Sequence, residues 1–189
     1  MAKFLSFLFI FSVSLFISAS IAGKNDEFAE VKKKKGIRYR SEKMSVFEFY
    51  WHDIVSGSNR TSMMVVPPAP NATANGFGVV NMIDNPLTAG PSPNSKLIGR
   101  AQGFYALASQ ERVELLMVMN FVFVQGKYCN STISVLGRNP VFDAEREMPV
   151  IGGSGLFRFA RGYVKLKTND FNLTTGDAVV KYTAHVLHF

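Results

Sequence analysis

The segment Phe49-Tyr-Trp-His-Asp-Ile-Val-Ser-Gly57 places a carboxylate at the end of an aromatic run. In an extended strand, side chains alternate between two faces with a period of two residues. Phe47, Phe49, Trp51 and Asp53 then share one face. A carboxylate in line with three rings is either a solvated acid beside a turn or an acid inside an apolar pocket. Only in a pocket would desolvation raise its pKa, so that it could exchange protons near neutral pH.

Other reaction chemistries find little support in the residues. The three histidines, His52, His185 and His188, stand in no cluster with cysteines or carboxylates at a metal-ligand spacing, so we predict neither a metal nor a cofactor. The stretch IGGSGL, residues 151–156, resembles a nucleophile elbow around Ser154, but a leucine occupies the place of the last glycine. It also lacks the lysine of a phosphate loop. A tight loop between strands is predicted there.

Short β segments follow one another from about residue 44, separated by Gly, Pro, Asn and Ser clusters. No segment has the pattern of a capped amphipathic helix. The candidate strands are Met44–Ile54, Arg60–Val66, Gly76–Asp84, Leu97–Leu107, Val113–Val124, Lys127–Leu136, Phe157–Thr168 and Ala178–His188. Residues 85–96 and 137–155 are predicted as loops. Eight strands without helices predict an all-β domain, either an antiparallel sandwich or a closed eight-stranded β-barrel.

The segment Val113–Val124, VELLMVMNFVFV, is apolar on both of its faces from Leu115 onward. A strand with one face exposed to solvent should alternate apolar and polar residues. In a barrel, one face would fill the interior, and a second subunit would cover the other, because no helix is available. The alternative is a central strand of a sandwich whose outer face is covered by the proline-rich loop. An oligomer is the favoured interpretation.

The N-terminal region indicates export. Residues 1–22 combine a short basic start, an apolar run from Phe4 to Ile17 and a small-residue end at Ala22, which is typical of a signal peptide; the run is short for a membrane anchor. A basic arm follows at 23–43, and the domain at 44–189. In an exported protein this arm suits a flexible segment or attraction to acidic wall polymers better than nucleic acid. Cys129 is the single cysteine, so an internal disulfide cannot form.

Five motifs, met in order along the chain, together resemble the plant dirigent protein family, and more closely its broad dirigent-like branch than the lignan-forming branch. The resemblance covers essentially the whole mature domain. The motifs are FYWHDIVSG (Phe49–Gly57), GRAQGFY (Gly99–Tyr105), STISVLGRNPV (Ser131–Val141), REMPVIGGSGLFRFARGY (Arg146–Tyr163) and YTAHVLHF (Tyr182–Phe189).

This resemblance implies an eight-stranded antiparallel barrel, usually a trimer, that is secreted to the apoplast and glycosylated. Its pocket would bind phenoxy radicals produced by a separate laccase or peroxidase and orient their coupling, without oxidising anything itself. By the same resemblance, Asp53 matches a pocket aspartate that moves protons as a quinone methide closes. Tyr105 matches a pocket tyrosine.

Arg146 matches an arginine whose partner in lignan-forming members is an aspartate seven residues earlier. Here that position is Asn139, and an amide cannot act as a general base. Arg158 replaces an apolar residue of the lignan-forming members and faces either the pocket or the outside. Phe49 and Trp51 complete the predicted substrate-binding residues.

Two classes of function remain open at this point, since both use a carboxylate beside an aromatic pocket. One is a directing protein that sets the stereochemistry of radical coupling toward lignan-type phenylpropanoid products. The other is an enzyme like the pterocarpan synthases, which remove water from an isoflavanol through a quinone methide. A third, weaker hypothesis is a defence or wall protein that binds phenolics and catalyses nothing.

The sequence predicts cleavage after Ala22 and N-glycosylation. The acceptor triplets begin at Asn59, Asn71, Asn130 and Asn172, each at a predicted turn or strand end. We expect the secreted protein to begin near Gly23 and to lose mass on glycosidase treatment. Intact mass spectrometry of plant-expressed protein measures both, and an intact Met1 or an unchanged mass would contradict the prediction.

Overall fold

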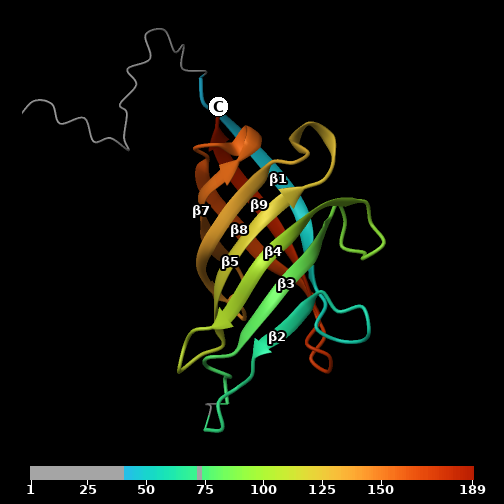
Figure 1. The fold of residues 1–189 in the computed structure, drawn as a ribbon, viewed down its shortest axis with the longest axis vertical. Helices are drawn as coiled ribbons and strands as arrows, with labels where there is room; N and C mark the ends of the chain where they lie inside the picture. The colour runs from blue at the N-terminus through green and yellow to red at the C-terminus, as the bar shows by residue number, and fades with distance from the viewer. Residues whose placement is uncertain (1–40, 72–73) are drawn as a thin grey trace, which may run out of the picture. The chain divides into compact units, whose positions relative to one another are not determined.

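The computed structural model of the protein describes residues 41–71 and 74–189. Strands dominate this part of the chain, and its helical residues form two short 3₁₀ turns, η1 and η2 (Figure 1). The strands are β1 (Lys43–Asp53), β2 (Ser62–Val66), β3 (Val80–Thr88), β4 (Leu97–Leu107), β5 (Glu114–Phe123), β6 (Thr132–Pro140), β7 (Arg146–Ser154), β8 (Arg161–Phe171) and β9 (Ala178–His188). The 3₁₀ turns are η1 (Gly126–Tyr128) and η2 (Gly155–Phe157).

The sheet closes on itself to form the predicted antiparallel barrel. The nine strands of the described chain follow the order β1-β9-β8-β7-β6-β5-β4-β3-β2, and β1 also pairs with β3. This last pairing joins the two ends of the sheet, so β1 and β3 to β9 form a closed eight-stranded barrel. Closure leaves these strands without the free edge that an open sheet would expose.

Strands β1 and β2 line up along one edge of β3. β1 pairs with β3 at Tyr50–Thr88 and Trp51–Leu87, and β2 pairs with the earlier part of β3, starting at Ser62–Ile83. Between them the chain loops outward and returns, since the Thr61 amide donates to the Ile54 carbonyl at 2.8 Å. The line formed by β1 and β2 is therefore interrupted immediately after Asp53.

A proline inside β3 fits this interruption. The amide of Asp84 donates to the Thr61 carbonyl at 2.9 Å, so alternate residues of β3 direct their amides toward the β1–β2 edge. Pro86 occupies the next such position and lies opposite the interruption, where a ladder donor is not required. This corrects the predicted loop over 85–96, because β3 continues through Pro86 to Thr88.

The second difference from the predicted strands lies in β7. The glycines and the two prolines of residues 137–155 predicted a loop, whereas β6 runs on to Pro140 and β7 occupies Arg146–Ser154. β7 tolerates these residues because most of it pairs on one side only: Arg146–Val150 pairs with β8, and Val150–Ser154 pairs with Thr132–Val135 of β6, with a register shift. The ladder between β6 and β7 ends at Val135–Val150, although Gly137 still lies against Met148. The predicted total of eight segments thus included β2 and omitted β7.

The two ends of the barrel interior differ. Near η1 and η2, the rings of Phe47, Phe123, Tyr128 and Phe157 pack at centroid separations of 5.1–6.1 Å and fill the interior. The opposite end is surrounded by the β4–β5, β6–β7 and β8–β9 connections and contains the pocket described below. The barrel is thus plugged at one end and hollow at the other.

Several expectations concern the chain's termini and surface. The predicted signal peptide and all but the last three residues of the predicted arm lie outside the described residues. All four glycosylation acceptors, Asn59, Asn71, Asn130 and Asn172, are exposed. In residues 41–71 and 74–189, no helix has the length and apolar character needed to cross a membrane.

The outer face of the barrel contains an apolar row. In β5 the odd positions Met117, Met119 and Phe121 are buried inside, so the even positions face outward. One register row joins Met82, Phe104, Val118 and Leu136 across β3 to β6. Met82 is 49% exposed and Leu136 is 40% exposed. An exposed apolar row of this kind is typical of a contact between protein molecules.

We expect Val118→Lys to dissociate the predicted oligomer, because a charge desolvated in an apolar contact costs several kcal/mol, roughly 2–7 for an unpaired polar group. Light scattering at micromolar concentration measures the change. The matched control is Val46→Lys, on the outer face of β1, where the native side chain is 53% exposed. A parent protein that is already monomeric would contradict the prediction.

Candidate functional site

A pocket of about 670 Å³ occupies the hollow end of the barrel. Its wall is mainly apolar, with two groups of polar side chains. The lining residues include Trp51, Asp53, Tyr105, Leu115, Asn139, Val141, Phe142, Arg146, Thr168, Phe171 and Val180. A mostly apolar cavity of this size, with a few polar groups, is typical of a binding site for a small organic molecule.

The first polar group surrounds Asp53, which is 7% exposed. The Asn85 amide donates to Asp53 Oδ1 at 3.0 Å, and the Tyr105 hydroxyl donates to Oδ2 at 3.0 Å. Ser62 lies 3.1 Å from the Tyr105 hydroxyl, and Thr61 donates to Asn85 at 2.6 Å. These residues come from β1, β2, β3 and β4 and meet where the line of β1 and β2 is interrupted. All of the partners of the carboxylate are neutral.

Burial in this wall raises the pKa of Asp53 from 3.8 to about 6, and the hydrogen bonds from Asn85, Tyr105 and Ser62 oppose the rise only in part. Both the acid and the carboxylate are therefore populated near pH 6. Because the folded-state pKa is raised, the stability that this group contributes is complete below pH 3.8 and is lost as the pH rises through about 6. The pKa of Tyr105 is also raised, by burial and by Asp53, so its hydroxyl remains a donor.

The second polar group surrounds Arg146, which is 5% exposed. Its Nη1 donates to Asn139 Oδ1 at 3.3 Å and to the Val141 carbonyl at 3.0 Å. Its Nη2 donates to Thr168 Oγ1 at 2.8 Å. This group lies beyond the end of the β6–β7 ladder, where the guanidinium joins side chains of β6 and β8 to β7. Burial lowers the pKa of Arg146 from its usual value, and no carboxylate contacts it among the described residues.

Three buried polar atoms have no hydrogen-bond partner within the described residues: Trp51 Nε1, Arg146 Nε and the Tyr182 hydroxyl oxygen. Trp51 and Arg146 line the pocket, and the rings of Trp51 and Tyr182 are 6.3 Å apart. Leaving such a group unpaired costs about 1–3 kcal/mol. A ligand oxygen that reached Trp51 or Arg146 would therefore gain a donor that the protein itself does not use.

The structure brings together most of the residues that the sequence singled out. Asp53, Trp51, Tyr105, Asn139 and Arg146 all line the pocket. Phe49 is fully buried beneath it, stacked on Tyr182 with ring centroids 5.7 Å apart, so its role is packing.

Arg158 does not reach the pocket. It is exposed and follows η2, at the plugged end of the barrel, so the structure does not support the prediction that it binds substrate. The alternation of buried and exposed side chains in β8 begins only after Arg158, at Val164.

Several functional candidates were missed by the sequence analysis. Asn85 and Ser62 hold the Asp53 carboxyl and its tyrosine, but Asn85 fell in the predicted proline loop. Thr168 contacts Arg146 from β8, and its alternation with Leu166 was the only available signal. Asp177 accepts the amides of Val55 and Ser56 at 2.9 and 3.1 Å and so fixes the loop that follows Asp53.

The histidines do not form part of this site. His52 is 2% exposed and lies 2.6 Å from Thr88 Oγ1, and His188 lies 2.9 Å from Ser45 Oγ at the plugged end. Within the described part of the chain, His, Cys, Asp and Glu form no group of three or more that could hold a metal ion.

A closed β-barrel with a buried acid beside an aromatic pocket defines the class of protein. The chain belongs to the dirigent-like family, whose model, described as "Dirigent-like protein", matches residues 44–187. It is 50% identical to Dirigent protein 7 of Arabidopsis thaliana, over 100% of both chains. It is 43% identical to Pterocarpan synthase 1 of Glycyrrhiza echinata, over 80% of this chain and 81% of that protein.

Solved structures agree with this assignment. The structure of a pterocarpan synthase dirigent protein superposes with a TM-score of 0.75 at 43% identity, and covers 80% of this chain and 89% of that chain. A second structure with the same description gives a TM-score of 0.74 at 44% identity, over 80% of this chain and 99% of that chain. The family and the barrel fold are thereby established.

The geometry predicts how Tyr105 tunes the acid. In Tyr105→Phe the carboxyl loses a donor that stabilises its charged form while the pocket stays apolar. We expect the pKa of Asp53 to rise further, by about one unit, the typical value of a hydrogen bond to a charged group. Carboxyl ¹³C NMR titration measures this, and Asp53→Asn identifies the resonance. A pKa that stays the same or falls would show that the contact does not stabilise the carboxylate.

Proposed function

We propose that this protein directs the stereochemistry of phenoxy radical coupling. A separate laccase or peroxidase removes a hydrogen atom from each phenol, and the barrel orients the two radicals as they join. The observation that carries the proposal is the buried Asp53 in the wall of a large aromatic pocket. With the dirigent family established, this geometry supports a role in proton movement on a bound phenolic molecule.

The chemical step assigned to Asp53 follows radical coupling. Coupling at the side chains gives a quinone methide, whose electrophilic carbon is attacked by a hydroxyl group. The new carbon–oxygen bond forms as the hydroxyl loses its proton and the quinone oxygen gains one. A group with a pKa of about 6 can accept and return such a proton near neutral pH. The pocket then sets which face of the carbon is attacked.

A specific observation favours a second candidate, the dehydration of an isoflavanol to a pterocarpan. Two solved structures that match this barrel, at 43% and 44% identity, are of pterocarpan synthases. Protonated Asp53 would supply the proton with which the hydroxyl leaves as water, while the conjugated phenol loses its proton to solvent and becomes the quinone methide. A second phenol then closes the ring, returning its proton to the Asp53 carboxylate as the quinone oxygen regains one from solvent. In addition, Asn139 stands opposite Arg146, so this second polar group contains no carboxylate to act as another base.

One experiment separates the two reactions. Chiral analysis of products from a panel of phenols and an isoflavanol, each with and without laccase, shows which substrates respond. Enantiomeric enrichment that depends on laccase supports the directing function. Turnover of the isoflavanol without any oxidase supports the dehydratase. Racemic products and no turnover under all conditions would leave only the binding of phenolics.

The proposal extends to the protein's location and partners. We propose that it is secreted to the apoplast, glycosylated and assembled as a homotrimer, and that it works beside an oxidase without nucleic acid, membrane or cofactor. The exposed acceptor asparagines and the apolar row on β3 to β6 support the glycans and the assembly.

Asp53→Asn is expected to fold, assemble and melt like the parent, because the amide keeps the shape of the side chain. Proton transfer is lost, and general acid or base assistance is worth about 10²–10⁴-fold. The stereoselective product or the turnover should fall accordingly, as measured by chiral chromatography. The matched control is Asp84→Asn on the outer face of β3, with a side chain that is 53% exposed. Full activity of the Asp53→Asn variant would contradict the proton-transfer role and show that Asp53 is only a turn residue.

A further inference from the structure

The β6–β7 loop, residues 141–145, forms one side of the pocket mouth. Val141, Phe142, Asp143 and Ala144 all line the pocket, although Phe142 is 68% exposed. The loop joins two strands whose ladder ends at Val135–Val150, well before the loop begins. Its position is therefore not set by the sheet, and depends on contacts made by the loop itself.

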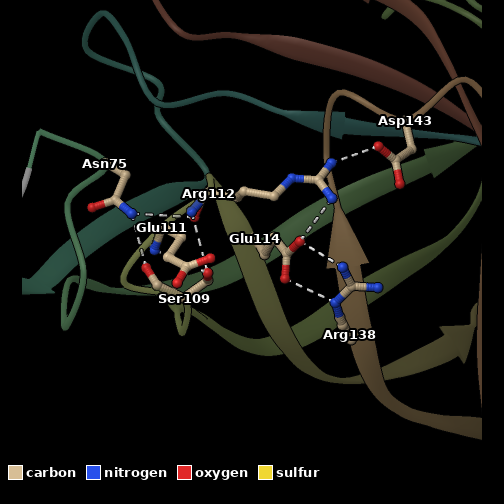
Figure 2. Close-up of polar contacts among 7 residues, drawn as sticks. All are labelled: Asn75, Ser109, Glu111, Arg112, Glu114, Arg138 and Asp143. Carbon is tan, nitrogen blue, oxygen red and sulfur yellow. Dashed lines mark hydrogen bonds and ion pairs between the residues drawn. The ribbon is translucent and has the colours of Figure 1, made fainter.

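The Asp143 amide donates to the Pro140 carbonyl at 3.0 Å within the turn, and three contacts that involve side chains hold this loop from outside it. On its outer side, Arg112 Nη2 donates to Asp143 Oδ1 at 2.8 Å (Figure 2). On the other side, the Phe142 ring meets the edge of Phe171, from the end of β8, at a centroid distance of 6.3 Å. From within, the Val141 carbonyl accepts from Arg146 Nη1 at 3.0 Å. A shift of the loop would therefore change the hydrogen bond between the Val141 carbonyl and the buried Arg146 guanidinium.

Neighbouring groups of the β4–β5 connection and of β5 orient Arg112 independently of its contact with the loop. Its Nη1 lies 3.4 Å from Glu114 Oε1, and Glu114 also accepts from Arg138 Nε at 2.8 Å (Figure 2). The backbone amide of Arg112 donates to Ser109 Oγ at 3.2 Å, and Asn75 donates to the Ser109 carbonyl at 3.0 Å. The β4–β5 connection is thereby braced at both ends. Arg112 presents one fixed donor to a loop that lacks ladder support.

We propose that Arg112 is a positioning residue for the pocket: through its ion pair with Asp143 it holds the β6–β7 loop over the mouth, and through the Val141 carbonyl it holds Arg146 in place. The consequence for ligand binding rests on the proposed function, which makes this pocket the substrate site. The mechanical role of Arg112 in closing the mouth does not depend on it.

The exposure of the Arg112–Asp143 ion pair determines what should change when the pair is broken. Arg112 and Asp143 side chains are 55% and 44% exposed, so their attraction is weak and is screened by salt. Breaking it should leave the barrel folded, because the core lies elsewhere. Local opening of the mouth should increase instead, as expected for a segment with few buried contacts.

Trp51 offers a direct measure of this opening. It is the only tryptophan in the chain, it lines the pocket and it is 4% exposed. We expect Arg112→Leu to increase acrylamide quenching of Trp51 fluorescence about two- to five-fold, the factor that an exposed ion pair typically contributes. Adding about 1 M salt, where the Debye length is roughly 3 Å, should raise quenching of the parent toward the same level.

A double-mutant cycle distinguishes a specific pair from general loosening. Asp143→Asn should raise quenching as Arg112→Leu does, and the double variant should be no worse than either single variant. Arg112→Lys keeps the charge and should restore most of the protection. The matched control is Arg161→Leu, which removes another exposed arginine–carboxylate pair, with Glu42, at the plugged end. Its quenching should equal that of the parent.

A binding measurement connects the mouth to function. As a probe we use an isoflavan lacking the hydroxyl that would leave as water, with Trp51 fluorescence as the signal. Its dissociation rate should rise in Arg112→Leu and return in Arg112→Lys. Failure of the parent to bind the probe would count against the dehydratase function alone. Equal quenching in parent, Arg112→Leu and Asp143→Asn at both ionic strengths would overturn the role of Arg112.

Discussion

The closing contact between β1 and β3 is the constraint on which the rest of the structure depends. Only two register pairs make it, Tyr50–Thr88 and Trp51–Leu87, before the line of β1 breaks off and resumes as β2. At the break, side chains take over from the backbone ladder: Asp53 accepts from Asn85 and Tyr105. A carboxyl group at the join of a closed barrel is largely shielded from bulk water, and this burial raises its pKa.

In the second polar group, around Arg146, side chains also take over where a backbone ladder is interrupted. The β6–β7 ladder ends before the pocket, and there the Arg146 guanidinium joins Asn139, Val141 and Thr168. Both polar groups of the pocket thus lie where backbone pairing is interrupted, while the walls between them remain apolar. A ligand in this cavity would meet an acid on one side, a cation on another and aromatic surface between them. These features suit a phenolic molecule that passes through a quinone methide.

Much of this arrangement could be predicted from the sequence, and the reasons for the failures are physical. Period-two alternation correctly placed Asp53 on the inner face with Phe49 and Trp51, and the apolar faces of β5 were correctly recognised. Pro86 and the glycines of β7 misled the strand assignment, because each lies where the ladder partner on one side is missing, which is a tertiary property. For the same reason Asn85 and Thr168 gave no signal by themselves: they become partners of Asp53 and Arg146 only when the barrel closes. The outward direction of Arg158 depends on the turn at η2, which spacing cannot show.

In the proposed function, a single buried acid that is half protonated near pH 6 controls the product. The most direct test is the enantiomeric excess, or the isoflavanol turnover, of the parent protein between about pH 4.5 and 8, with the oxidant supplied at a constant rate where one is needed. The account predicts a titration with an apparent pKa near 6, because only within that transition are both the acid and its carboxylate available. A profile that is flat across this range would contradict it.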